Sequence, residues 1–256
     1  MGTILEVKDL TKQFYKNKKL FTAVDHISFQ LQQGECLGIV GESGCGKSTT
    51  VKMLTHLLQP DGGEIFLDGT EIQYLKGKAL KKLYTEIQMV FQTPQDSFDP
   101  RRTLGDGIME SMKNQGISGK QARERMQQLL KQVELPLELA DRYPNQVSGG
   151  QCQRAAIARA LAIEPKILVC DEATSALDVT VQRQVVQEML RVRELFGTAI
   201  IIVTHDIGVV SAMADTVLVL QNGNRMEYGP AKSVLEHPRN EYTKELLSAV
   251  PKLRRS

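Results

Sequence analysis

The sequence of 256 residues predicts an α/β fold: a parallel-sheet core, an N-terminal antiparallel β layer and an inserted α-helical subdomain. Two strongly apolar segments, KILVCDE at 166–172 and TAIIIVTHD at 198–206, flank the helical pattern VQRQVVQEMLRVRELFG. Near-continuous apolar strands joined through a helix are typical of a buried parallel sheet. Polar loops and helical patterns over 93–165 indicate that this segment is an insertion.

Before the insertion, alternation and turn residues define the expected elements. Apolar and polar residues alternate over ISFQLQ, which is the period of a half-buried strand, and CLGIV is a short, mostly apolar strand. Residues 1–40 therefore predict short strands separated by turns. The amphipathic pattern that follows ends before Pro60, and an Asp-Gly pair further on is a hairpin signal. The predicted elements are strands at 27–32, 36–40 and 87–92, a helix at 47–58 and a hairpin at 64–72.

The last part of the sequence holds a second hairpin and a short tail. Asn-Gly stands between two extended pieces within 216–229, and the polar residues after Pro230 fit an amphipathic helix that follows a proline break. We expect one domain with three parts. These are a catalytic core with its antiparallel layer over 1–92 and 166–230, a helical subdomain over 93–165 and a C-terminal tail over 231–256.

Composition narrows the classes of function. Apolar residues make up 41% and charged residues 24% of the chain, which is ordinary for a soluble globular protein. A net charge of +2, aromatic residues at 5% and the lack of Trp argue against a nucleic-acid partner. The longest apolar runs are too short to cross a bilayer, and no secretory signal is visible. The four cysteines lack metal-ligand spacing, so reduced thiols are expected.

The segment Gly41–Ser48 carries the strongest local signal. It fits the pattern G-x-x-x-x-G-K-S, follows a predicted strand and opens a predicted helix. The glycines let successive N–H groups form a nest for a β-phosphate, and the helix start adds its dipole. We expect Lys47 to reach the β- and γ-phosphates and the Ser48 hydroxyl to ligate Mg²⁺. The alternative is a glycine-rich turn before an ordinary helix, which the context and the Lys-Ser ending disfavour.

Polar side chains end the neighbouring predicted strands. Asp171 closes the apolar run ILVCD, at the sheet edge where open parallel sheets bind ligands, and it can hold Mg²⁺ directly or through water. Glu172 can orient and deprotonate an attacking water, a role worth roughly 10²–10⁴ in rate. His205 ends the next core strand and can bond a γ-phosphate oxygen or the water. Gln92 ends IQMVFQ, where its amide can contact Mg²⁺ or water.

A second glycine-rich helix start lies within the expected insertion. Ser148, Gly149 and Gly150 stand directly before a run with helical character. Serine caps helix starts, glycine allows a ligand to approach the backbone closely, and a helix start attracts anions. The sequence therefore predicts two phosphate-binding sites on one chain.

The order of these motifs resembles the ATP-binding subunit of ABC transporters, and the resemblance covers essentially the whole chain. It implies a P-loop NTPase (RecA-like) core that uses ATP and Mg²⁺. It further implies that Glu172 is the catalytic base, His205 the switch histidine and Gln92 the Q-loop residue. The implied metal ligands are Ser48, Gln92 and Asp171. The implied nucleotide contacts are Gly41, Ser43, Gly44, Cys45, Gly46, Lys47, Ser48 and Thr49 in the Walker A loop, Ser148, Gly149, Gly150 and Gln151 in the signature motif, and Asp178 in the D-loop.

An aromatic residue stacks on adenine early in chains of this family. The stretch LTKQFYK offers Phe14 first and Tyr15 second. We assign the adenine contact to Phe14 in preference to Tyr15. The alternative is that either ring is a core residue.

Two further stretches resemble the branch that imports oligopeptides, dipeptides and nickel. These are FQTPQDSFDPRRT at 91–103 and GPAKSVLEHPRNEYTKELLSAVP at 229–251. Three residues depart from the usual family pattern without removing a ligand: Val147, Cys152 and Ala173. Some members carry a cysteine cluster near the C-terminus, and because no cysteine follows Cys170, no iron–sulfur site is expected in this subunit.

The resemblance implies a peripheral subunit at the cytoplasmic face of the inner membrane. Its partners would be a second ATPase subunit in a head-to-tail dimer, two membrane permeases and, indirectly, a solute-binding protein. In such a dimer, the signature motif of one chain contacts ATP held by the other. A heterodimer is favoured over two copies of one chain, and the solute stays open between peptides and a nickel or other metal chelate.

Two other functions share parts of this pattern. An ATPase of an exporter or a lipoprotein-release system has the same catalytic motifs, and only the stretch 91–103 and the tail argue against it. A soluble ABC ATPase acting on nucleic acid or the ribosome usually has two ATPase units, a coiled-coil insertion or zinc sites. Cys45, Cys152 and Cys170 lie inside nucleotide motifs. At these positions we favour small packing residues over a redox switch.

Overall fold

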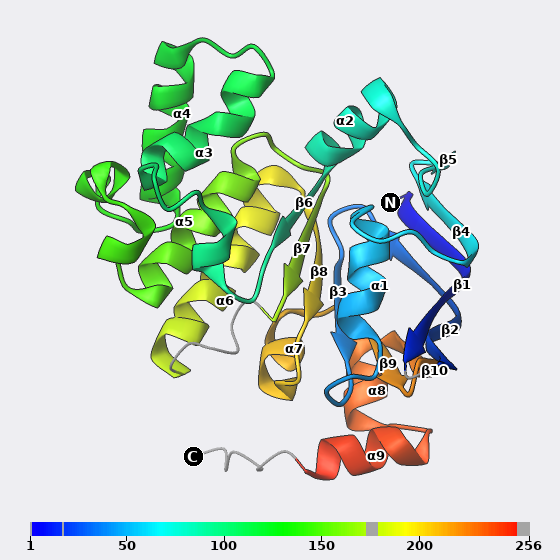
Figure 1. The fold of residues 1–256 in the computed structure, drawn as a ribbon. Helices are drawn as coiled ribbons and strands as arrows, with labels where there is room; N and C mark the ends of the chain where they lie inside the picture. The colour runs from blue at the N-terminus through cyan, green and yellow to red at the C-terminus, as the bar shows by residue number, and fades with distance from the viewer. Residues whose placement is uncertain (1, 17, 173–178, 250–256) are drawn as a thin grey trace. The chain divides into compact units, whose positions relative to one another are not determined.

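The computed structural model describes residues 2–16, 18–172 and 179–249, which form two compact units (Figure 1). The first unit holds the residues up to 81 and those from 199 onward, and the second holds residues 82–198. The chain passes from the first unit to the second within α2 (Gly77–Glu86). None of the described helices has the length and apolar character that crossing a membrane requires.

The first unit combines an antiparallel sheet with a group of parallel strands. β1 pairs antiparallel with β2 and with β4, and the sheet order is β2-β1-β4-β5. β3 pairs in parallel with β8 and with β9, and β10 is the antiparallel neighbour of β9. The strands are β1 (Thr3–Lys16), β2 (Lys19–Gln32), β3 (Cys36–Val40), β4 (Gly62–Leu67), β5 (Thr70–Glu71), β8 (Ala199–Val203), β9 (Thr216–Gln221) and β10 (Asn224–Pro230), and the helices are α1 (Lys47–Leu54), α7 (Ile207–Met213), α8 (Ala231–Glu236) and α9 (Glu241–Ser248).

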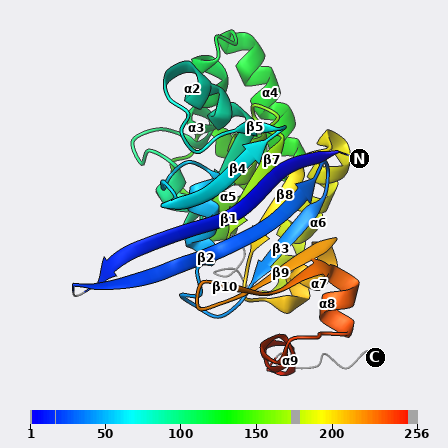
Figure 2. The ribbon, with the colours of Figure 1, turned by 90° about the vertical axis from the view of Figure 1, so that its right-hand side faces the viewer.

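The expectation of short strands over residues 1–40 was wrong for the first two. β1 and β2 have 14 residues each and form one long hairpin, and both strands extend past β4 (Figure 2). Register shifts on either side of Leu10 let the pairing continue through a bend, as β-bulges do. The alternation at the end of β2 is confirmed, because Ile27, Phe29 and Leu31 are buried.

The helix expected over 47–58 ends earlier, at Leu54. His56 adopts a left-handed backbone conformation with φ of 58°, and the N–H groups of Leu57 and Leu58 return to the carbonyl of Lys52. This arrangement satisfies the carbonyls at the helix end without a glycine. The pattern missed it because His56 gives no stop signal.

Both predicted hairpin turns are confirmed. Asp68 and Gly69 join β4 to β5 with φ values of 47° and 72°, and Asn222 and Gly223 join β9 to β10 with 47° and 80°. Positive φ at both central residues is what a type I′ turn requires, and Asn-Gly and Asp-Gly supply it readily.

The described part of the second unit is mostly helical and contains two parallel strands. β6 and β7 pair in parallel, with Val90 opposite Cys170, and every residue of β7 is buried. Together with the parallel strands of the first unit and its antiparallel sheet, this confirms the α/β class and the antiparallel layer. The elements are β6 (Ile87–Val90), η1 (Pro94–Ser97), α3 (Leu104–Asn114), α4 (Gly119–Gln132), η2 (Leu137–Asp141), η3 (Pro144–Gln146), α5 (Gly149–Leu161), β7 (Ile167–Asp171) and α6 (Val179–Phe196).

Candidate functional site

The glycine-rich loop of the first unit joins the buried strand β3 to α1, as the sequence predicted. Gly41 and Gly46 have φ values of 149° and 108°. A Cβ added to Gly41 would lie 2.1 Å from the Leu220 carbonyl oxygen, and one added to Gly46 would lie 2.4 Å from the Ala23 carbonyl oxygen. Only glycine fits these two positions, since a side chain would clash with backbone in an unfavourable conformation.

Lys47 is the first residue of α1 and is 4% exposed. Its ammonium group donates hydrogen bonds of 2.7 Å to the Gly41 carbonyl and 2.8 Å to the Glu42 carbonyl. The side chain therefore folds over the loop that precedes it. Within the described residues, no side chain caps the start of α1. Ser43 and Gly44 are exposed, whereas Ser48 and Thr49 are partly buried.

His205 follows β8 at the same sheet edge from which the loop leaves β3. Val203 is the register partner of Ile39, and the Thr204 N–H donates to the Ile39 carbonyl at 3.3 Å. His205 itself is exposed. Because the ends of paired parallel strands meet at one edge, the histidine belongs to the loop side of this unit.

Phe14 and Tyr15 lie near the end of β1, in the long hairpin. Phe14 is opposite Phe21, is 39% exposed and has the Lys12 ammonium 5.5 Å from its ring centre. Tyr15 is 81% exposed. Neither ring is a core residue, so the alternative of a buried packing role does not apply to either.

In the second unit, two of the predicted residues meet. The Gln92 side-chain amide donates a 2.9 Å hydrogen bond to a carboxylate oxygen of Glu172. Asp171, the last residue of β7, is 8% exposed, and Glu172 has a φ of 48°. Asp178, assigned by the resemblance, lies outside the described residues.

The Ser148-Gly149-Gly150-Gln151 segment forms the start of α5. The Ser148 hydroxyl accepts from the Gln151 N–H at 3.2 Å, and the Gln151 side-chain carbonyl accepts from the Ser148 N–H at 2.9 Å. This is a capping box. Ser148 and Gly149 are exposed, and a Cβ added to Gly149 would meet nothing within 4 Å. The helix start is thus preformed and open.

Comparison with known proteins identifies the family. Residues 24–175 match the family described as ABC transporter. The di/tripeptide transport ATP-binding protein DppF of Pseudomonas aeruginosa is 41% identical in an alignment of 258 positions, which covers 98% of this chain and 80% of that protein. The chain belongs to the ABC transporter family. The glutathione import ATP-binding protein GsiA of Pectobacterium atrosepticum is 44% identical over 97% of this chain, which spans only 41% of the length of GsiA.

Solved structures of ABC proteins have the same fold. The ATP-binding cassette MJ0796, solved as a dimer bound to ADP and Pi, has a TM-score of 0.82 and 31% identity, covering 89% of this chain and 98% of that one. CbiO1 of Clostridium perfringens, part of the ABC transporter complex CbiONQ, also has a TM-score of 0.82, with 30% identity over 93% of this chain and 92% of its own. The P-loop ABC fold implied by the sequence is therefore confirmed.

The four cysteines of this ABC chain lie in buried positions, as packing residues do. Within the described residues, Cys36, Cys45, Cys152 and Cys170 form no disulfide, and all four are buried. Burial raises the pKa of the Cys45 thiol, against the opposing charge of Lys47, and raises that of Cys152 to about 11. A redox switch at a helix start would need a lowered thiol pKa, whereas desolvation of these two thiols outweighs the nearby charge and favours a packing role.

Sequence reasoning missed a buried acid beneath the signature helix α5. Glu188 of α6 is 5% exposed, and the guanidinium of Arg154 on α5 lies 3.7 Å from its carboxylate. Burial raises the pKa of Glu188 to about 7. A signal was present in the sequence, since Glu188 stands three residues after Val185 and four before Val192, on the buried face of α6.

Proposed function

We propose that this chain is the ATP-hydrolysing subunit of an ABC importer. It would couple ATP binding and hydrolysis in a head-to-tail dimer to the uptake of peptides or of a nickel or other metal chelate. Relatives named for di/tripeptide transport and for glutathione import support import over export, and a peptide over a metal chelate. The chain covers about two-fifths of the glutathione relative, so the transported solute is part of the proposal.

The observation that carries the proposal is the loop around Lys47. Two glycines that tolerate no side chain, a buried lysine over the loop and an uncapped helix start form a pocket of N–H groups suited to phosphate oxygens. When ATP is bound, Lys47 would exchange the Gly41 and Glu42 carbonyls for the phosphates. The adenine would stack on Phe14, whose exposed ring supports that role over a core role.

The donor set proposed for Mg²⁺ consists of oxygen atoms. The hydroxyl of Ser48, the carboxylate of Asp171 and the amide oxygen of Gln92 are hard ligands of the kind that Mg²⁺ prefers. Among the described residues, no group of three or more His, Cys, Asp and Glu side chains could hold a metal ion. In the proposed site, the ion would take its other ligands from ATP phosphates and water. Bound Mg²⁺ would neutralise charge on the β- and γ-phosphates.

The residues proposed for chemistry each have one task. Glu172 would accept a proton from the attacking water, and its hydrogen bond to Gln92 orients it. His205 would bond the γ-phosphate or the water, and Asp178 would contact nucleotide at the dimer seam. The roles of Glu172 and His205 are supported by the family resemblance and by their position just after the strands β7 and β8, whereas the role of Asp178 rests on the resemblance alone.

The signature segment supports the dimer. The side chains of Ser148 and Gln151 cap α5. The backbone N–H groups at the exposed helix start would bind the γ-phosphate of ATP held by a partner chain. The partner would be a second ABC ATPase subunit, preferably a different one. We further propose two permease partners and peripheral attachment at the cytoplasmic membrane face. Helices of the 93–165 segment would pass the motion to the permeases.

The test compares two lysines at the start and end of one helix. Lys47→Ala should abolish Mg·ATP binding, measured with a fluorescent ATP analogue, because it removes the buried cation of the loop. Lys52→Ala, at an exposed site of α1, should bind like the wild type. ATP binding by Lys47→Ala at wild-type affinity would refute the site. Co-purification with permeases, and ATPase stimulation by a peptide-loaded binding protein, test the importer assignment.

A further inference from the structure

The C-terminal helix α9 contacts the nucleotide loop through one side chain. Tyr242 is 7% exposed, and its hydroxyl accepts a 3.1 Å hydrogen bond from the backbone N–H of Glu42. Its ring packs in a buried cluster with Val40, the last residue before the loop, and Ile207, which lies two residues after His205. One aromatic residue, 200 positions along the chain, thus bonds the backbone of the loop and belongs to the same buried cluster as the first residue of α7.

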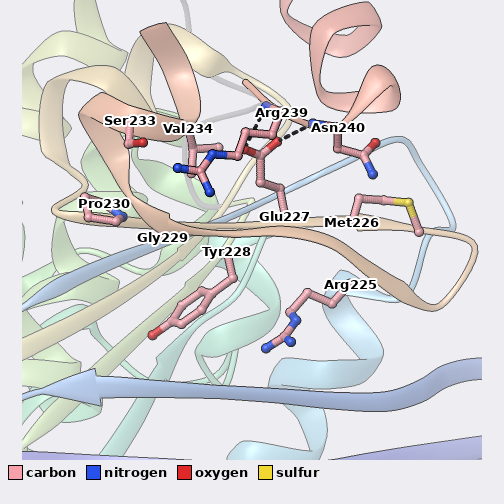
Figure 3. Close-up of a pocket in the computed structure, with 10 residues that line it drawn as sticks. All are labelled: Arg225, Met226, Glu227, Tyr228, Gly229, Pro230, Ser233, Val234, Arg239 and Asn240. Carbon is pink, nitrogen blue, oxygen red and sulfur yellow. Dashed lines mark hydrogen bonds between the residues drawn. The ribbon is translucent and has the colours of Figure 1, made fainter. Parts of the chain in front are cut away.

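A network of backbone hydrogen bonds fixes the position of Tyr242. The Glu227 carboxylate accepts from the N–H groups of Arg239 and Asn240 at 3.0 and 3.2 Å (Figure 3). The Asn240 side chain then caps α9 by accepting from the Tyr242 N–H at 2.9 Å. These bonds border a cavity of about 610 Å³ and define the turn between α8 and α9. The Tyr242 hydroxyl therefore reaches the loop from a rigid support.

Glu42 is held on both sides of its backbone. Its N–H is committed to Tyr242, and its carbonyl accepts from the Lys47 ammonium at 2.8 Å and from the Cys45 N–H at 3.3 Å. The Glu42 peptide is thus a fixed anchor from which the exposed part of the loop, Ser43 and Gly44, begins. The hydrogen bond between Tyr242 and Glu42 therefore affects the direction of the backbone N–H groups that follow in the loop.

We infer that Tyr242 is a positioning residue for nucleotide binding, which it supports by holding the Glu42 end of the loop. The inference rests on the proposed function of the loop. Burial raises the pKa of the Tyr242 hydroxyl, so it remains a neutral hydrogen-bonding group at physiological pH. It does not touch the nucleotide, and its effect passes through the orientation of the loop backbone.

Tyr242→Phe tests this bond while retaining the ring in its apolar cluster. Loss of one hydrogen bond is expected to weaken Mg·ATP binding by the full chain about threefold to tenfold. Amide hydrogen exchange at Glu42, measured without nucleotide, should become faster, which a purely structural role for the ring would not produce. The matched control is Tyr228→Phe, because the Tyr228 hydroxyl also bonds backbone, donating to the Gln30 carbonyl at 2.8 Å and accepting from its N–H at 3.2 Å.

The expected result is weaker ATP binding and faster Glu42 exchange in Tyr242→Phe alone. Wild-type affinity and exchange in Tyr242→Phe would overturn the inference, and so would an equal loss of affinity in Tyr228→Phe, since that points to general destabilisation. Lys47→Ala distinguishes a failure of the proposed function of the loop from a failure of the role inferred for Tyr242. If it loses ATP binding while Tyr242→Phe does not, only the role of Tyr242 fails. If it binds like the wild type, the proposed function and the inference fail together.

Discussion

The Gln92 amide and the Glu172 carboxylate form a 2.9 Å hydrogen bond at the ends of two paired strands. Gln92 leads into η1 and the helices beyond it, whereas Glu172 follows Asp171 at the end of β7. The bond therefore joins the segment that would report to the permeases with the proposed catalytic base. A change in the position of either residue alters the orientation of the carboxylate.

Glu172→Gln should separate ATP binding from hydrolysis. The amide has the size of the carboxylate and retains an oxygen that can accept from Gln92, but it cannot take a proton from water. Hydrolysis should fall by about 10²-fold or more, since general bases contribute roughly that much. Nucleotide affinity should stay at the wild-type level. Phosphate release and binding of an ATP analogue are the two measurements, and turnover at the native rate would remove Glu172 from the role of base.

Gly149→Asp should remove hydrolysis without disturbing the fold. A Cβ at Gly149 meets nothing within 4 Å, and an acid in the first turn of a helix is favourable, so the free chain should be as stable as the wild type. The carboxylate would, however, stand where a partner's γ-phosphate is expected and would repel it. ATP binding by the monomer should be retained, while ATP-dependent dimerisation and hydrolysis should be lost.

Gly119→Asp is the control for that substitution. Gly119 also opens a helix, α4, directly after a serine cap, and a Cβ there also meets nothing within 4 Å. The two variants should unfold alike in urea, and only Gly149→Asp should lose hydrolysis. Loss of ATP binding in a folded Gly149→Asp monomer would instead assign the signature segment to the chain's own site.

Sequence alone predicted the features that depend on neighbouring residues. The serine cap at Ser148 and the turns at Asp68-Gly69 and Asn222-Gly223 follow from local chemistry, and the structure has each of them. The buried strands β7 and β8 follow from uninterrupted apolar runs. In these cases the residue types within a few positions suffice to determine the conformation.

Features that depend on distant contacts were not predictable. In the sequence, Tyr242 resembles any other residue of an amphipathic tail. No neighbouring residue in the sequence indicates that its hydroxyl bonds the backbone 200 positions earlier. The length of the β1–β2 hairpin depends on pairing across bulges, which alternation within one strand does not reveal. The end of α1 depends on a left-handed His56, which most sequence rules reserve for glycine or asparagine.

The buried thiols should resist modification in the native chain. Because burial raises the pKa of Cys45 and brings that of Cys152 to about 11, almost no thiolate is present at pH 7.5. A thiol-reactive dye should label all four cysteines only after unfolding, and mild oxidation should leave ATPase activity unchanged. A cysteine placed at the exposed site of Ser233 should react at once and serve as the control. Fast labelling of native Cys45 or Cys152 would contradict this account.

Glu188 should make the stability of the chain fall as pH rises. Both of its carboxylate oxygens lack a hydrogen-bond donor among the described residues, and it faces Arg154, with Glu134 and Arg191 beside the adjoining cavity of about 190 Å³. Burial raises its pKa from 4.5 to about 7. Between these values the folded chain keeps a proton that the unfolded chain has released, so this contribution to stability is complete below pH 4.5 and is lost as pH approaches 7.

Glu188→Gln should remove that dependence, because a neutral amide does not titrate. The free energy of unfolding in urea should match the wild type near pH 4.5 and exceed it at pH 7.5 by on the order of 2–3 kcal/mol. Glu194→Gln is the control, since Glu194 is an exposed acid on the same helix, and its pH profile should follow the wild type. Equal profiles for the wild type and Glu188→Gln would show that Glu188 is ionised without penalty, stabilised in full by Arg154.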